Sequence, residues 1–269
     1  MMKEGLLRLT AFQVASLRIV FAGLVLLPWA ISNLKKVPKN KLGIIFFSGV
    51  LGSLLPAYLF CVAELGIDSA LAGTLNSLTP IFVIITGALF FNSRTSTNKI
   101  LGILIAFTGS IFLLLSKGHM QESQNLMYVS YVVLATICYG FNVNMVHKHL
   151  HDIGSLQIAS VALTLNAIPA LIVLYFTGYF NLPLNDSGIL YSTGHAALLG
   201  ILATAIASVI FYVLIKRAGA VFSSMVTYGI PIIANFWGII YGEEVGWKQF
   251  GCLILILVGV YLANRKISG

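Results

Sequence analysis

The chain has 269 residues, of which 58% are hydrophobic and only 9% are charged. Soluble domains carry roughly 25% charged residues, so this composition excludes an ordinary soluble protein and indicates one that is embedded in a lipid bilayer. A net charge of +8 would suggest a nucleic-acid surface in a soluble domain. In a membrane protein it reports orientation instead, and we expect no nucleic-acid partner.

Nine apolar stretches are predicted to cross the membrane as helices, because about 20 apolar residues cover the hydrocarbon core. Short polar turns separate them. In chain order they are Phe12 to Ile31, Leu42 to Gly66, Ala70 to Phe91, Ile100 to Leu115, Leu126 to His147, Leu156 to Thr177, His195 to Ile215, Ala220 to Tyr241 and Gln249 to Ala263. The expected fold is an all-α polytopic membrane protein.

Lysine and arginine are distributed unevenly between the two sides of the membrane. Eleven of the sixteen fall in the connections after the first, third, fifth and seventh stretches and at the C-terminus. Four lie on the opposite side, and Arg18 lies inside the first stretch. Because cytoplasmic loops collect Lys and Arg, the C-terminus is predicted to be cytoplasmic and the N-terminus of this nine-helix chain to be outside.

Two of the stretches share an interruption at matching positions. Pro80 and Pro231 each break an apolar span, and they are separated by 151 residues. A membrane helix tolerates proline only where neighbouring groups or water satisfy the freed backbone, and paired interrupted spans indicate the central site of a transporter. We predict two units, residues 1–116 and 126–266, inserted in opposite orientations. A complete unit has five helices, and the first helix of the first unit is expected to be missing.

Sequence motifs in both units carry a family resemblance. The segment LIKRAGAVFSSMVTYGIPIIANFWGIIYGEE, followed by KQFGCLILILVGVYLANR, resembles the C-terminal EamA unit of the drug/metabolite transporter superfamily. AFQVASLRIVFAGLVLLP and SALAGTLNSLTPIFVIITGALFF resemble its N-terminal unit. The resemblance implies a ten-helix fold of two inverted units around a central cavity, which exports or imports small metabolites such as amino acids. We expect an exporter in the plasma (inner) membrane.

Polar side chains at membrane depth are the candidates for a substrate site, because burying them without partners is costly. They lie beside the two prolines or well inside other spans. The predicted cavity lining is Tyr58, Asn76, Ser77, Thr79, Pro80, Tyr139, Asn142, Asn166, Thr227, Tyr228, Pro231, Asn235 and Trp237. The alternative role for the Asn, Ser and Thr members is hydrogen bonding between helices.

Two charged residues complete the candidate site. Arg18 is the one cation inside an apolar stretch, and it could act as the counter-charge for a carboxylate substrate. The alternatives are that Arg18 extends to the outer interface or pairs with Glu64, which lies near the outer end of its own stretch. Glu64 itself is a weaker candidate for a proton-coupling carboxylate.

Neither a metal site nor a cofactor is expected. His147 and His151 in the segment HKHLH are one helical turn apart, but they lie at a predicted helix C-terminus beside Lys148, where cations favour the helix dipole. No P-loop pattern and no set of nucleophile and base is present, so we expect no enzyme. The leading prediction is a secondary transporter of a small organic solute, and the alternative is a structural or partner-binding membrane protein.

Small residues follow each other at four-residue spacing in the fourth stretch. Gly102, Ala106 and Ser110 therefore share one helix face. Such faces allow close helix packing. The partner helix could belong to the same chain or to a second protomer of a homo-oligomer.

Overall fold

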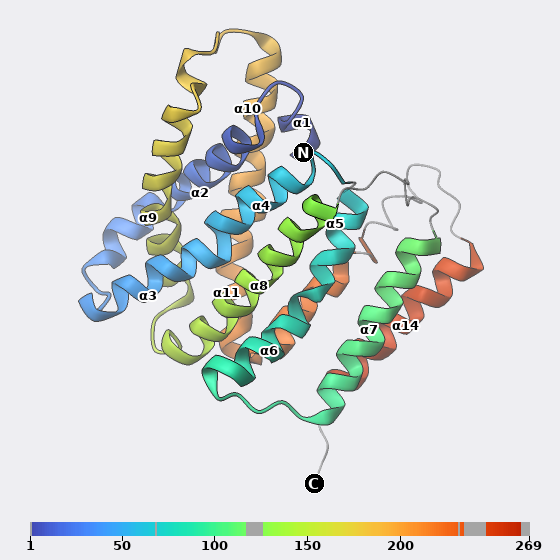
Figure 1. Ribbon diagram of the computed structural model, residues 1–269. Coiled ribbons are helices and arrows are strands. Elements are labelled where there is room, and N and C mark those ends of the chain that lie inside the picture. The colour runs from blue at the N-terminus through green and yellow to red at the C-terminus, as the bar shows by residue number, and fades with distance from the viewer. Residues whose placement is uncertain (1, 68, 117–125, 231, 234–245, 265–269) are drawn as a thin grey trace.

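The computed structural model describes residues 2–67, 69–116, 126–230, 232–233 and 246–264. In this part of the chain the regular secondary structure is entirely helical, as predicted (Figure 1). The α-helices are α1 (Met2–Gly5), α2 (Ala11–Leu34), α3 (Lys39–Gly49), α4 (Leu55–Ala63), α5 (Ser69–Leu75), α6 (Thr79–Phe91), α7 (Thr97–Ser116), α8 (Leu126–His149), α9 (Ser155–Phe176), α10 (Ser187–Gly200), α11 (Ala207–Ala218), α12 (Ala220–Ser224) and α14 (Trp247–Asn264).

Within the described residues, six helical stretches are long and apolar enough to cross a membrane: Ala11–Leu34, Lys39–Ala63, Leu71–Phe91, Leu126–His149, Ser155–Phe176 and Ser187–Ala218. Two shorter apolar helices, Thr97–Leu113 and Trp247–Ala263, accompany them. These eight coincide with eight of the nine predicted stretches. The remaining one, Ala220 to Tyr241, is described over residues 220–230 and 232–233, and its other residues lie outside the described part of the chain.

The seventh predicted stretch begins earlier than expected. It was predicted to start at His195, but α10 begins at Ser187 and continues into α11. Asp186 is the N-cap, and its carboxylate accepts hydrogen bonds from the backbone N–H groups of Gly188 and Ile189. An Asp directly before the first turn is a strong helix-start signal, so the extra two turns follow from capping that hydropathy alone does not detect.

Short non-α segments interrupt the long helices at corresponding places in the two halves. The π-helical segments η1 (Val50–Leu54) and η4 (Ile201–Ile206) join α3 to α4 and α10 to α11, and their first residues are 151 positions apart. The 3-10 segments η2 (Asn76–Leu78) and η5 (Met225–Tyr228) come shortly before the two prolines. The break predicted at Pro80 therefore begins one turn before the proline.

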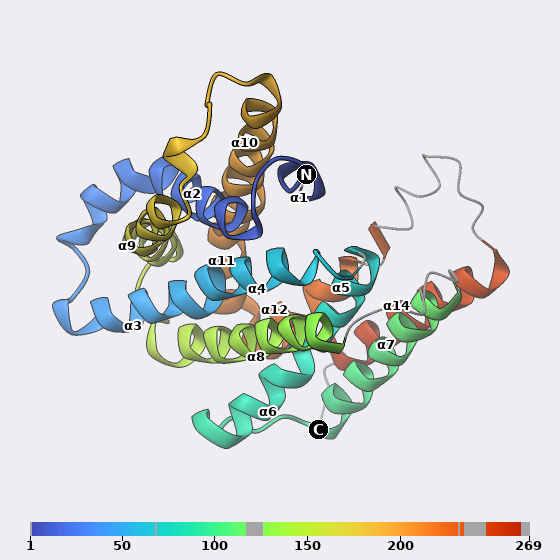
Figure 2. The ribbon, with the colours of Figure 1, turned by 45° about the horizontal axis from the view of Figure 1, so that its top comes forward.

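Helices α7 and α14 form a close pair at one side of the molecule, and both ribbon views show them side by side (Figures 1 and 2). A Cβ atom added to Gly102 would come within 2.5 Å of the Gly259 carbonyl oxygen, and one added to Gly259 within 2.4 Å of the Ala106 nitrogen. The small residues of α7 thus pack against α14 of the same chain. Of the two partners considered for this helix face, the structure shows the one within the same chain.

Helix α2 packs against α9 on the opposite side (Figure 2). Thr10 and Gln13 form a capping box at the start of α2, and the Gln13 side chain also donates to the Thr177 carbonyl at 3.0 Å. A Cβ on Gly23 would lie 2.7 Å from the Ala167 Cβ. This close contact joins a helix of the first half to a helix of the second.

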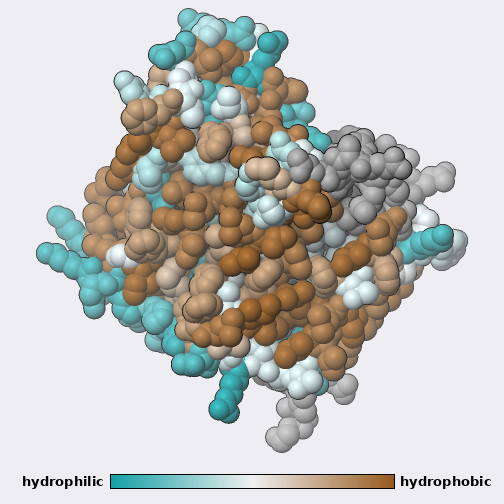
Figure 3. Space-filling model, viewed as in Figure 1, coloured by the Kyte–Doolittle hydropathy of each residue, from teal (hydrophilic) through white to brown (hydrophobic). Residues whose placement is uncertain are grey.

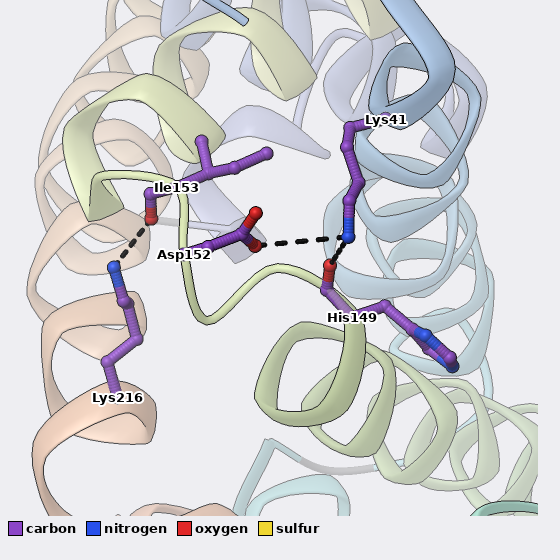
Figure 4. A network of polar contacts seen from close by, with 5 residues as sticks. All are labelled: Lys41, His149, Asp152, Ile153 and Lys216. Carbon is purple, nitrogen blue, oxygen red and sulfur yellow. Dashed lines mark hydrogen bonds and ion pairs between the residues drawn. The ribbon is translucent and has the colours of Figure 1, made fainter. Parts of the chain in front are cut away.

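The two ends of the bundle are hydrophilic and the visible middle is hydrophobic (Figure 3). At one end, lysine ammonium groups bind backbone carbonyls at the end of α8 and in the connection that follows it (Figure 4). Lys41 donates to the His149 carbonyl at 2.6 Å and lies 3.9 Å from the Asp152 carboxylate, and Lys216 donates to the Ile153 carbonyl at 2.6 Å. The connection between α8 and α9 is thereby held from α3 on one side and α11 on the other.

A buried amide connects α6 to α8. The side-chain nitrogen of Asn144 donates to the Val83 carbonyl at 2.8 Å, to the Thr86 hydroxyl at 3.0 Å and to the Gly140 carbonyl at 2.9 Å. The sequence does not distinguish this residue from Asn142, two positions earlier. The contacts assign Asn144 to interhelical packing.

The substitution Asn144→Leu is expected to destabilise the protein by about 1–2 kcal/mol, because interhelical hydrogen bonds in membranes contribute about 0.6 kcal/mol each on average. Thermal unfolding in detergent micelles measures the change. Asn98→Leu, at an exposed position in the first turn of α7, is the control and should leave the transition unchanged. Equal transitions for Asn144→Leu and the wild type would show that these bonds contribute nothing to stability.

Candidate functional site

A cavity of about 500 Å³ lies where four non-α segments, η1, η2, η4 and η5, converge. Helices α2, α6, α8 and α11 complete its wall. Its polar lining is Arg18, Ser53, Asn76, Thr79, Tyr139, Asn142, Thr204, Ser208 and Thr227, and its apolar lining is Gly52, Ala203, Ala207, Ile210, Phe211, Leu214, Val226 and Ile230. π turns and broken helices inside membrane proteins typically mark functional sites, since they expose backbone and redirect side chains.

The lining follows the 151-residue offset seen in the sequence. Each half contributes a residue at each of four equivalent positions. The pairs are Gly52 with Ala203, Ser53 with Thr204, Asn76 with Thr227, and Thr79 with Ile230. Equivalent positions of the two halves of the chain therefore line the same cavity.

Several predicted site residues are brought together at this cavity. Asn76, Thr79, Tyr139, Asn142 and Thr227 all line it. Thr79 donates a hydrogen bond to the Asn76 side-chain oxygen at 3.2 Å. As their spacing suggested, Tyr139 and Asn142 share a face of α8, and that face is turned to the cavity.

Asn142 has an incomplete set of hydrogen bonds. It is 2% exposed, and its side-chain oxygen has no hydrogen-bond partner among the described residues. The absence of a side chain at Gly52 makes room for it, because a Cβ there would lie 2.3 Å from the Asn142 side-chain nitrogen. A buried acceptor without a partner costs stability unless a ligand or water satisfies it.

Arg18 also lines the cavity. Its Nε atom donates to the Thr204 hydroxyl at 2.6 Å, so the side chain crosses from α2 to η4. Glu64 does not line the cavity, and no ion pair between Arg18 and Glu64 occurs in the described structure. Among the described residues that line the cavity there is no acid, so the cavity carries a positive charge.

Other predicted site residues lie in contacts between helices. The Tyr58 hydroxyl is 2.8 Å from the Ser16 hydroxyl. Asn166 donates to the Phe46 carbonyl at 3.1 Å, and the fully buried Tyr228 donates to the Ile103 carbonyl at 2.9 Å. These three are not among the described lining residues, and contact with a solute stays a prediction for them.

The remaining predicted residues divide into two groups. Ser77 and Pro80 are buried beside the cavity but do not line it, and the Ser77 hydroxyl has no partner among the residues described. Pro231, Asn235 and Trp237 lie outside the described residues. Contact with a solute stays a prediction for both groups.

Sequence reasoning missed the contribution of the π-helical segments. Gly52, Ser53, Ala203 and Thr204 are small residues in apolar runs without a charge, and of the two pairs only Gly52 and Ser53 are followed closely by a proline, Pro56. The signal that could have found them is the repeat itself. Applying the offset of the prolines to Ser53 leads directly to Thr204.

The model of a family described as "EamA-like transporter family" matches residues 1–115 and again residues 126–265. The chain belongs to the EamA-like transporter family. As a member, it is a polytopic membrane protein and a membrane transporter, and the predicted fold class is confirmed.

Two relatives extend the comparison of this EamA-like chain. An "Uncharacterized transporter" from Archaeoglobus fulgidus is 26% identical over 264 residues, which cover 96% of this chain and 90% of that protein. A protein of known crystal structure has the same fold, with a TM-score of 0.71 at 16% sequence identity over 98% of this chain and 90% of that one.

Metal binding and enzymatic catalysis are the alternatives to transport for this EamA-like protein. The described residues contain no group of three or more His, Cys, Asp or Glu side chains able to hold a metal ion. His147 and His149 are exposed at the end of α8, beside Lys148, which donates to the Phe91 carbonyl at 2.8 Å. Family and relative both indicate a transporter and not an enzyme.

Proposed function

We propose that this protein is a secondary transporter that exports small organic metabolites such as amino acids across the plasma membrane. The observation that carries the proposal is the cavity at the junction of the four non-α segments, which combines nine polar residues with an apolar wall. Solute sites of transporters lie near the bilayer midplane between structural repeats and are built by interrupted helices.

The mechanism that we propose is alternating access by two inverted repeats. The support is the pairing of lining residues at one offset, together with the pairing of η1 with η4 and of η2 with η5. Helices α2 with α9, and α7 with α14, occupy equivalent places in the two halves and pack in pairs. Rocking of the halves about these contacts would open the cavity to each side in turn.

The orientation that we propose places the lysine-rich end in the cytoplasm. The support is that Lys41, Lys148 and Lys216, which come from three of the connections rich in Lys and Arg, all bind backbone carbonyls at this end. Under the positive-inside rule, the C-terminus is cytoplasmic and the N-terminus of this chain is outside.

Counterflow in proteoliposomes tests the function. Vesicles loaded with a pool of unlabelled amino acids and related organic acids should accumulate labelled members of the pool. Asn76→Leu and Thr227→Leu, at equivalent cavity positions, should each lower the initial rate roughly tenfold, because each removes a hydrogen-bonding group from the solute site.

Thr108→Leu is the matched control for this experiment. Thr108 is exposed on α7 and bonds only to the Leu104 carbonyl of its own helix in the described structure, so its replacement should not change the rate. Failure of every solute in the pool to accumulate would contradict the proposed transport. Accumulation that neither cavity substitution affects would show that the solute follows another route.

A further inference from the structure

The cavity contains a cation whose charge is not neutralised locally. A charged arginine at membrane depth is costly unless a partner compensates it. Arg18 has five N–H donors, and the Nε donor binds the Thr204 hydroxyl. No carboxylate among the described residues forms an ion pair with it, and the terminal nitrogens therefore carry donors available to a ligand.

The arginine is held in place from two directions. Gly200 lets α10 approach the backbone of α2 closely, since a Cβ at Gly200 would lie 2.4 Å from the Arg18 carbonyl oxygen. The 2.6 Å bond to Thr204 in the following π segment then fixes the Nε edge of the guanidinium. A guanidinium held at Nε can still present its two terminal nitrogens to a planar pair of oxygen atoms.

We propose that Arg18 binds the carboxylate of the transported solute and thereby selects solutes that carry one. This inference rests on the proposed transport function. The charge count favours a carboxylate over a phosphate monoester, because one arginine offsets one negative charge and a phosphate monoester carries about two at neutral pH. The apolar wall at Phe211 and Leu214 receives the carbon chain of the solute.

Asn142 supplies a second point of recognition. Asn142 lines the cavity, and its buried side-chain oxygen lacks a partner in the described structure, so this oxygen is the acceptor that a donor on the solute, such as an amine, would use. Because this acceptor is neutral and Arg18 is charged, the carboxylate contributes more to binding than the amine does. The site accepts both amino acids and simple carboxylic acids of similar size.

Matched solutes test the proposal in the counterflow assay. The first series is L-leucine, 4-methylpentanoate and isopentylamine, and the second is L-phenylalanine, 3-phenylpropanoate and 2-phenylethylamine. The wild type should exchange the two carboxylate-bearing members of at least one series and exchange the amine roughly tenfold more slowly or not at all, since the amine lacks the charge-assisted bond to Arg18.

Variants assign the selectivity to Arg18. Arg18→Gln should lower carboxylate exchange roughly tenfold or more, and Arg18→Lys should restore it only in part, because an ammonium group lacks the planar fork of donors. Thr204→Val should act like a weaker form of Arg18→Gln. Its counterpart Ser53→Ala removes an equivalent hydroxyl that has no bond to Arg18 and should leave the carboxylate preference intact.

Glu64→Gln distinguishes solute binding by Arg18 from a structural ion pair between Arg18 and Glu64. If Arg18 served to balance Glu64, then Glu64→Gln would impair exchange as strongly as Arg18→Gln, which would overturn the proposal. We expect it to leave exchange unchanged. Thermal unfolding in detergent identifies any variant that fails to fold, and competition by leucinamide and phenylalaninamide against the parent amino acids then provides a test on the wild type alone.

The other possible results distinguish failure of the carboxylate assignment from failure of the proposed transport. Exchange of the amines as fast as the acids, competition by the amides as strong as that of the amino acids, or an equal loss of all solutes in folded Arg18→Gln would overturn the carboxylate assignment and leave transport standing. Absence of exchange for both series and for the whole pool used above would instead contradict the proposed function.

Discussion

Gly259→Leu is expected to separate α14 from α7 and to destabilise the protein by about 3 kcal/mol or more, at the upper end of the range for overpacked cores. The nearest atoms to a new Cβ are the Ala106 nitrogen at 2.4 Å and the Gly102 carbonyl oxygen at 2.6 Å. These are backbone atoms of a rigid helix and cannot rotate away, so the two helices have to move apart. The unfolding temperature should fall by roughly 10 °C.

Gly251→Leu on the same helix is the matched control. No atom lies within 4 Å of a Cβ placed at Gly251, and this position is exposed, so thermal unfolding in detergent should show no loss of stability. If Gly259→Leu and Gly251→Leu unfolded at the same temperature, the close packing of α7 and α14 would contribute nothing to stability.

Gly52→Leu is expected to abolish transport while preserving the fold. The nearest atoms to a Cβ at Gly52 belong to the side chain of Asn142, at 2.3 Å for its nitrogen, and a side chain can move where a backbone cannot. The leucine would displace Asn142 and occupy part of the cavity. We expect the counterflow rate to fall roughly 100-fold, which corresponds to about 2.7 kcal/mol of lost solute binding.

Gly43→Leu provides the comparison for this variant. Gly43 lies earlier on the same transmembrane stretch, and no atom lies within 4 Å of a Cβ placed there. Its replacement should leave both the counterflow rate and the unfolding temperature unchanged. Normal transport by folded Gly52→Leu would mean that solutes do not pass through this cavity.

The sequence was sufficient to locate the membrane helices because hydropathy depends on composition over whole segments. Eight of the nine predicted stretches coincide with apolar helices of the described structure. The start of α10 was placed eight residues late, since the N-cap at Asp186 is a local hydrogen-bonding feature that a hydropathy average obscures. Interrupted spans were recognisable because proline leaves a direct chemical mark.

The site was predictable only where residue type alone restricts the role. Tyr139, Asn142 and Asn76 stood out as polar residues in apolar spans, and they line the cavity. Asn166 and Tyr228 stood out for the same reason but form bonds between helices. Composition cannot distinguish the two roles, because both satisfy a polar group at membrane depth and differ only in which neighbour is nearest.

The π-helical segments also affect how helix faces must be assigned in this protein. Ile45 and Leu54 are nine residues apart, which places them on opposite sides of a regular α-helix at about 100° per residue, yet both are buried. Ala196 and Ala205 repeat the same spacing in the second half, and both are buried as well. A π turn holds one residue more than an α turn. Without that extra residue each pair is eight positions apart, and residues at this spacing lie on the same face of an α-helix. A helical wheel drawn through residues 39–63 or 187–218 therefore needs a change of phase at η1 or η4, and without that change it would assign part of the buried surface to lipid.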